Sequence, residues 1–447
     1  MRIPRIGPRI PRIGSGIPLI GSGGPSLGRR AFLGGAAATA ASLAMGGRAR
    51  AESVSAADRR FLFIYTMGGW DMTRVFAPLF DYEDIDMEHD AALATVGNIP
   101  YVDHAARPSV KAFFEAYYER IAIVNGFYIS SISHSSAIRM VTTGTPDASQ
   151  PDWGSRLAAW RSEKHIVPYL VVGGPVFSGP YGVHVGHAGT NGQLQGLATG
   201  DILDNSDVTF TRPSEADGAL VDSYLLGAAA RKAKAYSGVT SKGFQESYGI
   251  ALDKAMQLKN LSGTIDLDRG EVFADQVALA ARALSMGLSR CVAVSHPKPE
   301  VTVLWDSHAN NDMEQTILFE DFFAEMLDLM EVLETTPGAQ AATLADETVV
   351  VVLSEMGRTP QLNGSNGKDH WPYGTAMMWG PGVRGNSVVG AFDEKQYGVD
   401  VDFETGQESE NGSSIGPNVL GSTLMVLGDV DPADEGLVDL PVTALLE

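Results

Sequence analysis

The run Thr348–Leu353 (TVVVVL) leads without a break into the charged segment 354–360 (SEMGRTP). Consecutive β-branched residues with no polar interruption predict a strand covered on both faces, as in a parallel sheet with helices on either side. In open α/β sheets, ligands bind beyond the carboxyl ends of the strands. We therefore expect Glu355 and Arg358 to lie at a ligand site.

Two more apolar runs end in acids or histidines. Residues 61–65 (FLFIY) precede a Gly-Gly turn and Asp71, and residues 301–304 (VTVL) precede Asp306 and His308. Carboxylates and imidazoles are ligands for divalent metals such as zinc, manganese, magnesium or calcium. The recurrence of the pattern predicts a site for one or two such ions.

A glycine-rich segment supplies a further expected ligand, His370. Asp369 would orient His370 through its second ring nitrogen, and Lys368 would help to bind an anion or else be solvated. Glu355 is expected to bind the metal or, alternatively, to form a structural ion pair with Arg358. If free of that pair, Arg358 would hold a planar oxyanion by a bidentate contact.

Other candidate residues have structural alternatives as well. Asp71 and Asp306 are expected as metal ligands, but each could instead bond nearby backbone N–H groups, in a turn or at a helix cap. His134, in the polar loop 130–136, is expected to be a ligand or proton shuttle, or else a surface histidine. Ser135 would be the nucleophile if a base or metal activates it, with water as the alternative.

Strands and helices are expected to alternate along the rest of the chain. Further strands are expected at residues 121–124, 167–172, 291–295 and 375–379. Helices are expected at residues 110–119, 153–163, 219–261, 271–288, 314–333 and 418–427. This order predicts an α/β fold with a mostly parallel central sheet and helices on both faces. Residues 52–447 are expected to form one domain, with a cap or loop insertion around residues 173–260.

The first 51 residues are expected to lie outside that domain. Residues 2–14 repeat a short Arg-Ile-Pro pattern, and Arg29 and Arg30 precede an alanine-rich apolar stretch and a small-x-small cleavage site at residues 49–51. These features are typical of a twin-arginine export signal, which predicts a periplasmic or secreted protein. A membrane anchor is the alternative, but the stretch is short and interrupted by glycine. No membrane span is expected in the mature chain.

Composition excludes several other classes of function. The formal net charge of −21 argues against nucleic-acid binding, which requires a basic surface. The single cysteine, Cys291, excludes an internal disulfide framework and a multi-cysteine zinc site, and is expected to be an inert core residue. Neither a Walker-type phosphate loop nor a GxGxxG dinucleotide motif occurs.

Five motifs, taken in order, resemble a known family. They are residues 68–71 (GGWD), 133–135 (SHS), 305–308 (WDSH), 354–360 (SEMGRTP) and 367–371 (GKDHW). Together they resemble the Domain of Unknown Function 1501 family, which is itself similar to the alkaline-phosphatase superfamily with its sulfatases. The resemblance implies an alkaline-phosphatase-like αβα sandwich with a metal site at the strand ends. Its substrate would be a small-molecule or polymer-linked anionic ester.

The resemblance also implies roles at individual positions. Asp71 matches the aspartate after the first strand, and His370 matches the late histidine that completes one metal site. Asp306 and His308 match an aspartate–histidine pair, although they are two residues apart rather than the usual four. Where the superfamily has Asp-His after the next strand, this chain has Glu355 followed by methionine, which leaves one ion or two open.

Two functions are therefore expected from the sequence. The first is an exported metal-dependent hydrolase of phosphate or sulfate esters. The second is a non-catalytic exported binding protein that retains the fold, in which ion pairs hold the strand-end cluster together. The two differ in whether the carboxylates and imidazoles converge on one point. The sequence does not indicate an oligomeric state.

Overall fold

The computed structural model describes residues 54–189, 194–199, 214–235, 239–261, 264–267, 270, 272–296 and 305–447. These residues belong to one compact unit, Ala51–Glu447. The expected export signal and the expected strand at residues 301–304 lie outside the described residues. Among the described helices, none combines the length and apolar character needed to cross a membrane.

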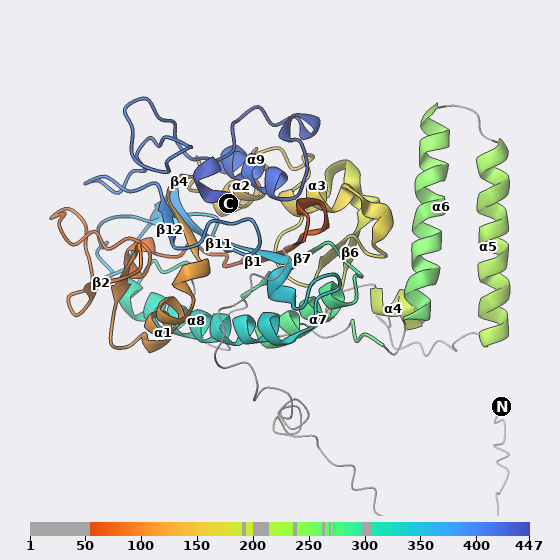
Figure 1. The fold of residues 1–447 in the computed structure, drawn as a ribbon, viewed down its shortest axis with the longest axis horizontal. Helices are drawn as coiled ribbons and strands as arrows, with labels where there is room; N and C mark the ends of the chain where they lie inside the picture. The colour runs from red at the N-terminus through yellow and green to blue at the C-terminus, as the bar shows by residue number, and fades with distance from the viewer. Residues whose placement is uncertain are drawn as a thin grey trace, which may run out of the picture. The chain divides into compact units, whose positions relative to one another are not determined.

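An eight-stranded sheet forms the centre of the fold (Figure 1). Its strands, in spatial order, are β12 (Ser387–Val389), β4 (Ala122–Tyr128), β11 (Tyr373–Trp379), β8 (Thr348–Leu353), β1 (Arg60–Tyr65), β7 (Cys291–Ser295), β5 (Tyr169–Val171) and β6 (Val185–His187). All neighbouring strands are parallel except β11, which is antiparallel to β4 and β8. The predicted α/β fold with a mostly parallel sheet is confirmed.

Helices cover both faces of the sheet (Figure 1). One face carries α1 (Pro108–Tyr117), α7 (Phe273–Ser285) and α8 (Asn311–Thr335). The other carries α2 (His134–Thr143), α3 (Trp153–Ala159) and α9 (Pro417–Leu427). The expected cap region contains α4 (Leu194–Thr199), α5 (Glu215–Ala235) and α6 (Val239–Asn260). A sheet covered in this way buries its apolar strands on both sides, as the valine run requires.

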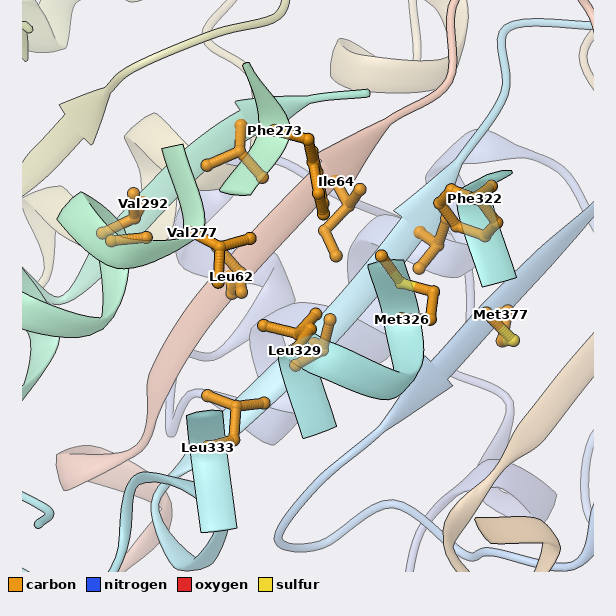
Figure 2. Packing of buried hydrophobic residues seen from close by; sticks show 14 of the residues in the cluster. Leu62, Ile64, Phe273, Val277, Val292, Phe322, Met326, Leu329, Leu333 and Met377 are labelled. Carbon is orange, nitrogen blue, oxygen red and sulfur yellow. The ribbon is translucent and has the colours of Figure 1, made fainter. Parts of the chain in front are cut away.

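The two hydrophobic cores follow from the alternation of side chains along each strand. In β1, Leu62 and Ile64 face the core beneath α7 and α8, whereas Phe61 and Phe63 face the core on the opposite side. Figure 2 shows Leu62 and Ile64 packed with side chains from both helices, among them Met326 of α8. The central strands are therefore held in place from both sides, which fixes the positions of their carboxyl ends.

Three differences from the expected elements are found. The segment at residues 130–136 was expected to be a polar loop, but it becomes helical at His134, where α2 begins. The helix is capped at its carboxyl end by Gly144, which has the left-handed backbone conformation that glycine adopts easily. The expected helix at residues 153–163 ends at Ala159, because Arg161 has a φ of 60°. Two short antiparallel pairs also form, namely β2 (Ala92–Val96) with β3 (Ile99–Asp103) and β9 (Gly357–Arg358) with β10 (His370–Trp371).

The contact between α9 and α3 gives a test of the packing. A Cβ atom at Gly421 would overlap the ring of Trp153. We expect Gly421→Ala to lower the free energy of unfolding by about 1–3 kcal/mol, because the added methyl group overpacks the core. Gly249→Ala on α6 is the matched control, since no atom lies within 4 Å of its added Cβ. Alanine should be neutral or stabilising there, and equal thermal unfolding of the two variants would contradict this packing.

Candidate metal centre

The candidate site lies where several connections leave the carboxyl edge of the sheet. His134 is the first residue of α2, and Glu355 follows β8 directly. Asp306 and His308 lie in a tight turn before α8, where the His308 N–H donates to the Asp306 carbonyl at 3.1 Å. His370 begins β10. The site thus collects side chains from four separate segments of the chain.

Each of three histidines uses its Nδ1 atom for a contact with a fixed acceptor. His134 Nδ1 lies 2.8 Å from Glu355 Oε1, and His308 Nδ1 lies 2.9 Å from Asp369 Oδ1. His370 Nδ1 lies 2.7 Å from the carbonyl oxygen of Ile132. Carboxylate and carbonyl oxygens only accept hydrogen bonds, so all three Nδ1 atoms carry the proton and donate it. In the neutral rings, the Nε2 atoms are left with their lone pairs.

These Nε2 atoms turn toward the carboxylate of Asp306. His308 Nε2 and His370 Nε2 each lie 3.1 Å from Asp306 Oδ1, and His134 Nε2 lies 3.3 Å from Oδ2. His308 Nε2 and His370 Nε2 are only 3.0 Å apart. His134, Asp306 and His370 together offer three ligand atoms within 4.8 Å of one another, and His308 adjoins them.

Arg358 holds the carboxylate at the centre of this group. Its Nη2 atom donates to Asp306 Oδ1 at 2.7 Å. Burial alone would raise the pKa of Asp306, but the hydrogen bond and charge of Arg358 lower it to about 2. The guanidinium is fully buried and also donates to the carbonyls of Gly68, Gly69 and Lys368. Arg358 therefore pairs with Asp306 rather than with Glu355, and its role here is to position Asp306.

The pairing of β9 with β10 explains how two of these groups meet. Arg358 and His370 are direct partners across the two strands. The ring of His370 also lies against the rings of His134 and His308, with centroids 4.4 and 4.7 Å away. Asp369 was expected to orient His370, but it bonds His308 instead, because neighbouring residues on an extended segment point to opposite sides.

Glu355 lies behind His134. Its two carboxylate oxygens accept the backbone N–H of Gly68 at 2.8 and 2.9 Å, and the carboxylate is almost fully buried. Gly68 has a φ of 130°, and a Cβ atom there would come within 2.7 Å of Trp305 Cβ. The Gly-Gly turn is thus required for this approach. The hydrogen bond from His134 to Glu355 raises the pKa of His134.

Asp71 lies outside the group formed by Asp306 and the three histidines. It is fully buried, and its oxygens accept hydrogen bonds from Thr73 and from Asn311 of α8. Lys368 Nζ lies 3.0 Å from Asp71 Oδ2, and Arg74 Nε lies 3.6 Å away. Burial would raise the pKa of Asp71, but these two cations hold it well below its usual range. This placement matches the turn-residue alternative, and Lys368 faces Asp71 instead of solvent.

Ser135 is the second residue of α2, adjacent to His134, and its side chain is exposed. Within the described part of the chain, no hydrogen bond from its hydroxyl group is found. The first turn of α2 presents free backbone N–H groups, since bonding to the Ser133 carbonyl begins at Ser136 and Ala137. Ser135 therefore lies where a helix amino terminus meets the imidazole cluster.

The structure also brings together residues that the sequence analysis did not single out. The Ile132 carbonyl fixes the ring of His370, and no sequence pattern marks a backbone acceptor of this kind. A second group combines His296, at the end of β7, with Asp321 and Glu325 of α8. Their spacing of four residues on a helix was the available signal for the two acids.

One family model matches most of the chain. The family model described as Protein of unknown function (DUF1501) matches residues 108–405. No curated protein matches the chain.

Several solved structures are similar to the chain. One is a protein in the alkaline phosphatase superfamily from Vibrio parahaemolyticus, at 9% identity and a TM-score of 0.35, covering 89% of this chain and 72% of that one. Another is a 2-O GAG sulfatase, at 10% identity and a TM-score of 0.39, covering 87% and 74%. A third is Ps i-CgsB in complex with k-i-k-neocarrahexaose, at 10% identity and a TM-score of 0.39, with 86% of this chain and 75% of that chain covered. At such TM-scores these likenesses carry no argument about activity, which must rest on the side chains.

The buried pair of Lys368 and Asp71 gives a test of the support beneath the site. Burial lowers the pKa of Lys368 to about 8, although Asp71 opposes this. We expect Lys368→Met to lower the free energy of unfolding by about 3 kcal/mol, because it leaves a buried carboxylate short of a partner. Lys111→Met is the control, since Lys111 and Glu115 form an exposed pair 3.8 Å apart and its loss should cost less than about 1 kcal/mol. Equal unfolding curves in urea would contradict the proposed support.

Proposed function

We propose that this chain, which belongs to the family of Protein of unknown function (DUF1501), is an exported, metal-dependent hydrolase of phosphate or sulfate esters. The family description assigns no activity, so the proposal is based on the side chains of the site. One observation carries the proposal. Three imidazole Nε2 atoms face a single ionised carboxylate, that of Asp306, and all three rings are locked by contacts on Nδ1.

The residues fit a divalent cation. His134 Nε2 is buried and has no hydrogen-bond partner among the described residues. With both Nδ1 protons committed, the Nε2 lone pairs of neutral His308 and His370 oppose each other at 3.0 Å, and a bound cation, or a proton on one Nε2, relieves this repulsion. Ligating histidines commonly donate their other ring N–H to a carboxylate or carbonyl, as all three do here. Asp306 with two or three of these histidines would hold the ion, and imidazole ligands favour zinc over manganese, magnesium or calcium.

A divalent cation supplies Lewis-acid polarisation of the ester oxygens and lowers the pKa of a coordinated hydroxyl group. Other residues of the chain hold the expected ligands in the orientation that this chemistry requires. Arg358 keeps Asp306 ionised and oriented, and Glu355 keeps the ring of His134 turned inward. Because these contacts are already formed and have one buried partner each, they need no rearrangement when a substrate arrives.

The amino terminus of α2 would receive the anionic ester. Its free N–H groups and the positive end of the helix dipole attract phosphate or sulfate oxygens. The Ser135 hydroxyl group would attack the phosphorus or sulfur atom, with water as the alternative nucleophile. In the overall reaction, one bond from that atom to the leaving alcohol breaks and one to a water oxygen forms. The leaving alcohol takes up a proton.

A second candidate function is a non-catalytic exported binding protein. The observation that favours it is the burial of Arg358, whose donors are used within the protein, so it does not face a substrate oxyanion. Such a protein would bind the metal and the anion without turnover.

The metal site can be tested with the full chain, first stripped of metal by a chelator. We expect the wild-type protein to bind zinc or manganese in calorimetry and to hydrolyse a chromogenic aryl phosphate or sulfate. His370→Ala should abolish both, because it removes an expected ligand. Asp369→Asn should weaken metal affinity about 10–100-fold, because His308 loses the carboxylate that orients it.

Asp90→Asn is the matched control for the last variant. Asp90 makes the same contact with His89, at 3.1 Å, on the exposed surface, so metal binding should not change. Absence of metal binding by the wild-type protein, or turnover that His370→Ala leaves intact, would refute the hydrolase. Metal binding without turnover on any phosphate or sulfate ester would favour the binding protein.

Export is proposed from the amino-terminal sequence. The support is the pair Arg29 and Arg30 ahead of an apolar alanine-rich stretch. We expect the double variant Arg29→Lys, Arg30→Lys to remain in the cytoplasm with its amino terminus uncleaved, as cell fractionation would show. The control Arg9→Lys, Arg12→Lys changes the preceding extension and should be exported normally. Normal export of the first variant would contradict the assignment.

A further inference from the structure

A basic pocket lies at the opposite edge of the sheet from the candidate metal centre. It has a volume of about 290 Å³ and lies where β1 and β7 begin, at Arg60 and just after Arg290. The strands are parallel, so their amino ends share this edge. At about 3.3 Å per residue, the six-residue strands β1 and β8 separate the two edges by roughly 20 Å. The pocket is therefore a separate site.

Five cationic side chains line this pocket, in a chain whose formal net charge is −21. They are Arg59, Arg60, Arg161, Lys164 and Arg290. Asp58 is the only acidic residue in the lining. Its Oδ1 atom lies 2.9 Å from Lys164 Nζ, and this hydrogen bond, with one from Ser55, lowers the pKa of Asp58 to about 2.

Arg290 is one of the buried cations that line the pocket. Its side chain is buried, and it donates hydrogen bonds to the carbonyls of Arg59, Leu157, Trp160 and Gly428. No carboxylate pairs with it among the described residues. Carbonyl oxygens satisfy the donors of a guanidinium group but do not neutralise its charge, and burial accordingly lowers the pKa of Arg290.

The neighbouring cations are compensated to different degrees. Arg60 pairs with the buried Glu347 at 2.8 Å, behind the pocket wall, while Arg161 reaches Asp429 only at 3.5 Å in an exposed pair. Arg59 Nε is buried and has no hydrogen-bond partner in the described part of the chain.

Two further carboxylates, Glu347 and Glu447, act on pocket cations without lining the pocket themselves. Glu347 also accepts the backbone N–H groups of Ala339, Gln340 and Ala341, so its charge is spread over several donors. His165 donates from Nδ1 to the Gly287 carbonyl, and burial lowers its pKa to about 4, so it is neutral at pH 7. Burial lowers the pKa of Arg59, and the negative charge of Glu447 opposes this. The pocket wall therefore presents mainly guanidinium and ammonium groups.

From this geometry we propose that the pocket is a binding site for a multivalent oxyanion, either free phosphate or sulfate or such a group on a small molecule. Like charges gathered around one cavity repel each other. An oxyanion that accepts hydrogen bonds from the partly exposed Arg161 and Lys164 would also offset the charge of the buried guanidinium groups, whose donors are largely used within the protein. Guanidinium groups match phosphate and sulfate better than they match chloride, because they donate in a planar fork. The volume suits a phosphate, a diphosphate or a sugar phosphate and is too small for a polymer.

Calorimetry of the full chain tests the proposal, with phosphate, pyrophosphate and glucose 6-phosphate as probes at constant ionic strength in chloride. The His370→Ala background removes anion binding at the metal centre, so a failure of the hydrolase proposal leaves this test unaffected. We expect saturable binding of at least one probe. Tightest binding of inorganic phosphate or pyrophosphate would identify a free anion, and tightest binding of glucose 6-phosphate a phosphate on a larger molecule.

The double variant Arg161→Gln, Lys164→Gln should weaken this binding at least tenfold. Both side chains are partly exposed, so the fold should survive, as an unchanged melting temperature without anion would verify. The control Lys111→Gln, Arg120→Gln removes the same charge from partly exposed positions outside the pocket and should bind as tightly as its parent. No saturable binding of any probe, or equal affinities of the two double variants, would overturn the proposal.

Discussion

The hydrogen bonds on the Nδ1 atoms of His134, His308 and His370 are the constraint on which the rest of the site depends. Each bond selects one tautomer and one ring orientation, and together they turn three Nε2 atoms toward Asp306. The three acceptors come from the end of β8, from the segment before β10, and from the backbone ahead of α2. The site therefore exists only when the sheet and its connections are fully folded.

Buried polar contacts behind the site hold its carboxylate and imidazole groups in place. Arg358 donates hydrogen bonds both to Asp306 and to a carbonyl of the Gly-Gly turn. The backbone N–H of Gly68 in that turn donates to Glu355. Deeper still, Lys368 and Asp71 form a buried pair. Removing one partner of such a pair is costly, so these residues make the site rigid even though they do not face it.

Much of this arrangement could be predicted from the sequence, because strands buried on both faces are recognisable as apolar runs. The β8 run and the β1 run gave the sheet and the edge at which Asp306, His308 and His370 meet. The remainder depended on contacts that no local pattern encodes. Asp71 follows a strand as a metal ligand would, yet Asn311 and Lys368, both distant in sequence, surround its carboxylate. Arg358 is buried because β9 pairs with β10, and Asp369 reaches His308 because of the alternation along β10.

The two edges of the sheet thus have opposite characters, with imidazoles and carboxylates at the carboxyl ends and guanidinium groups at the amino ends. The central claim concerns the first edge, and anomalous diffraction from crystals of the full chain grown with zinc tests it most directly. The account predicts a zinc peak at about 2.0–2.2 Å from His370 Nε2 and from a carboxylate oxygen of Asp306. A well-ordered site without such a peak, with His308 and His370 still in direct contact, would contradict it.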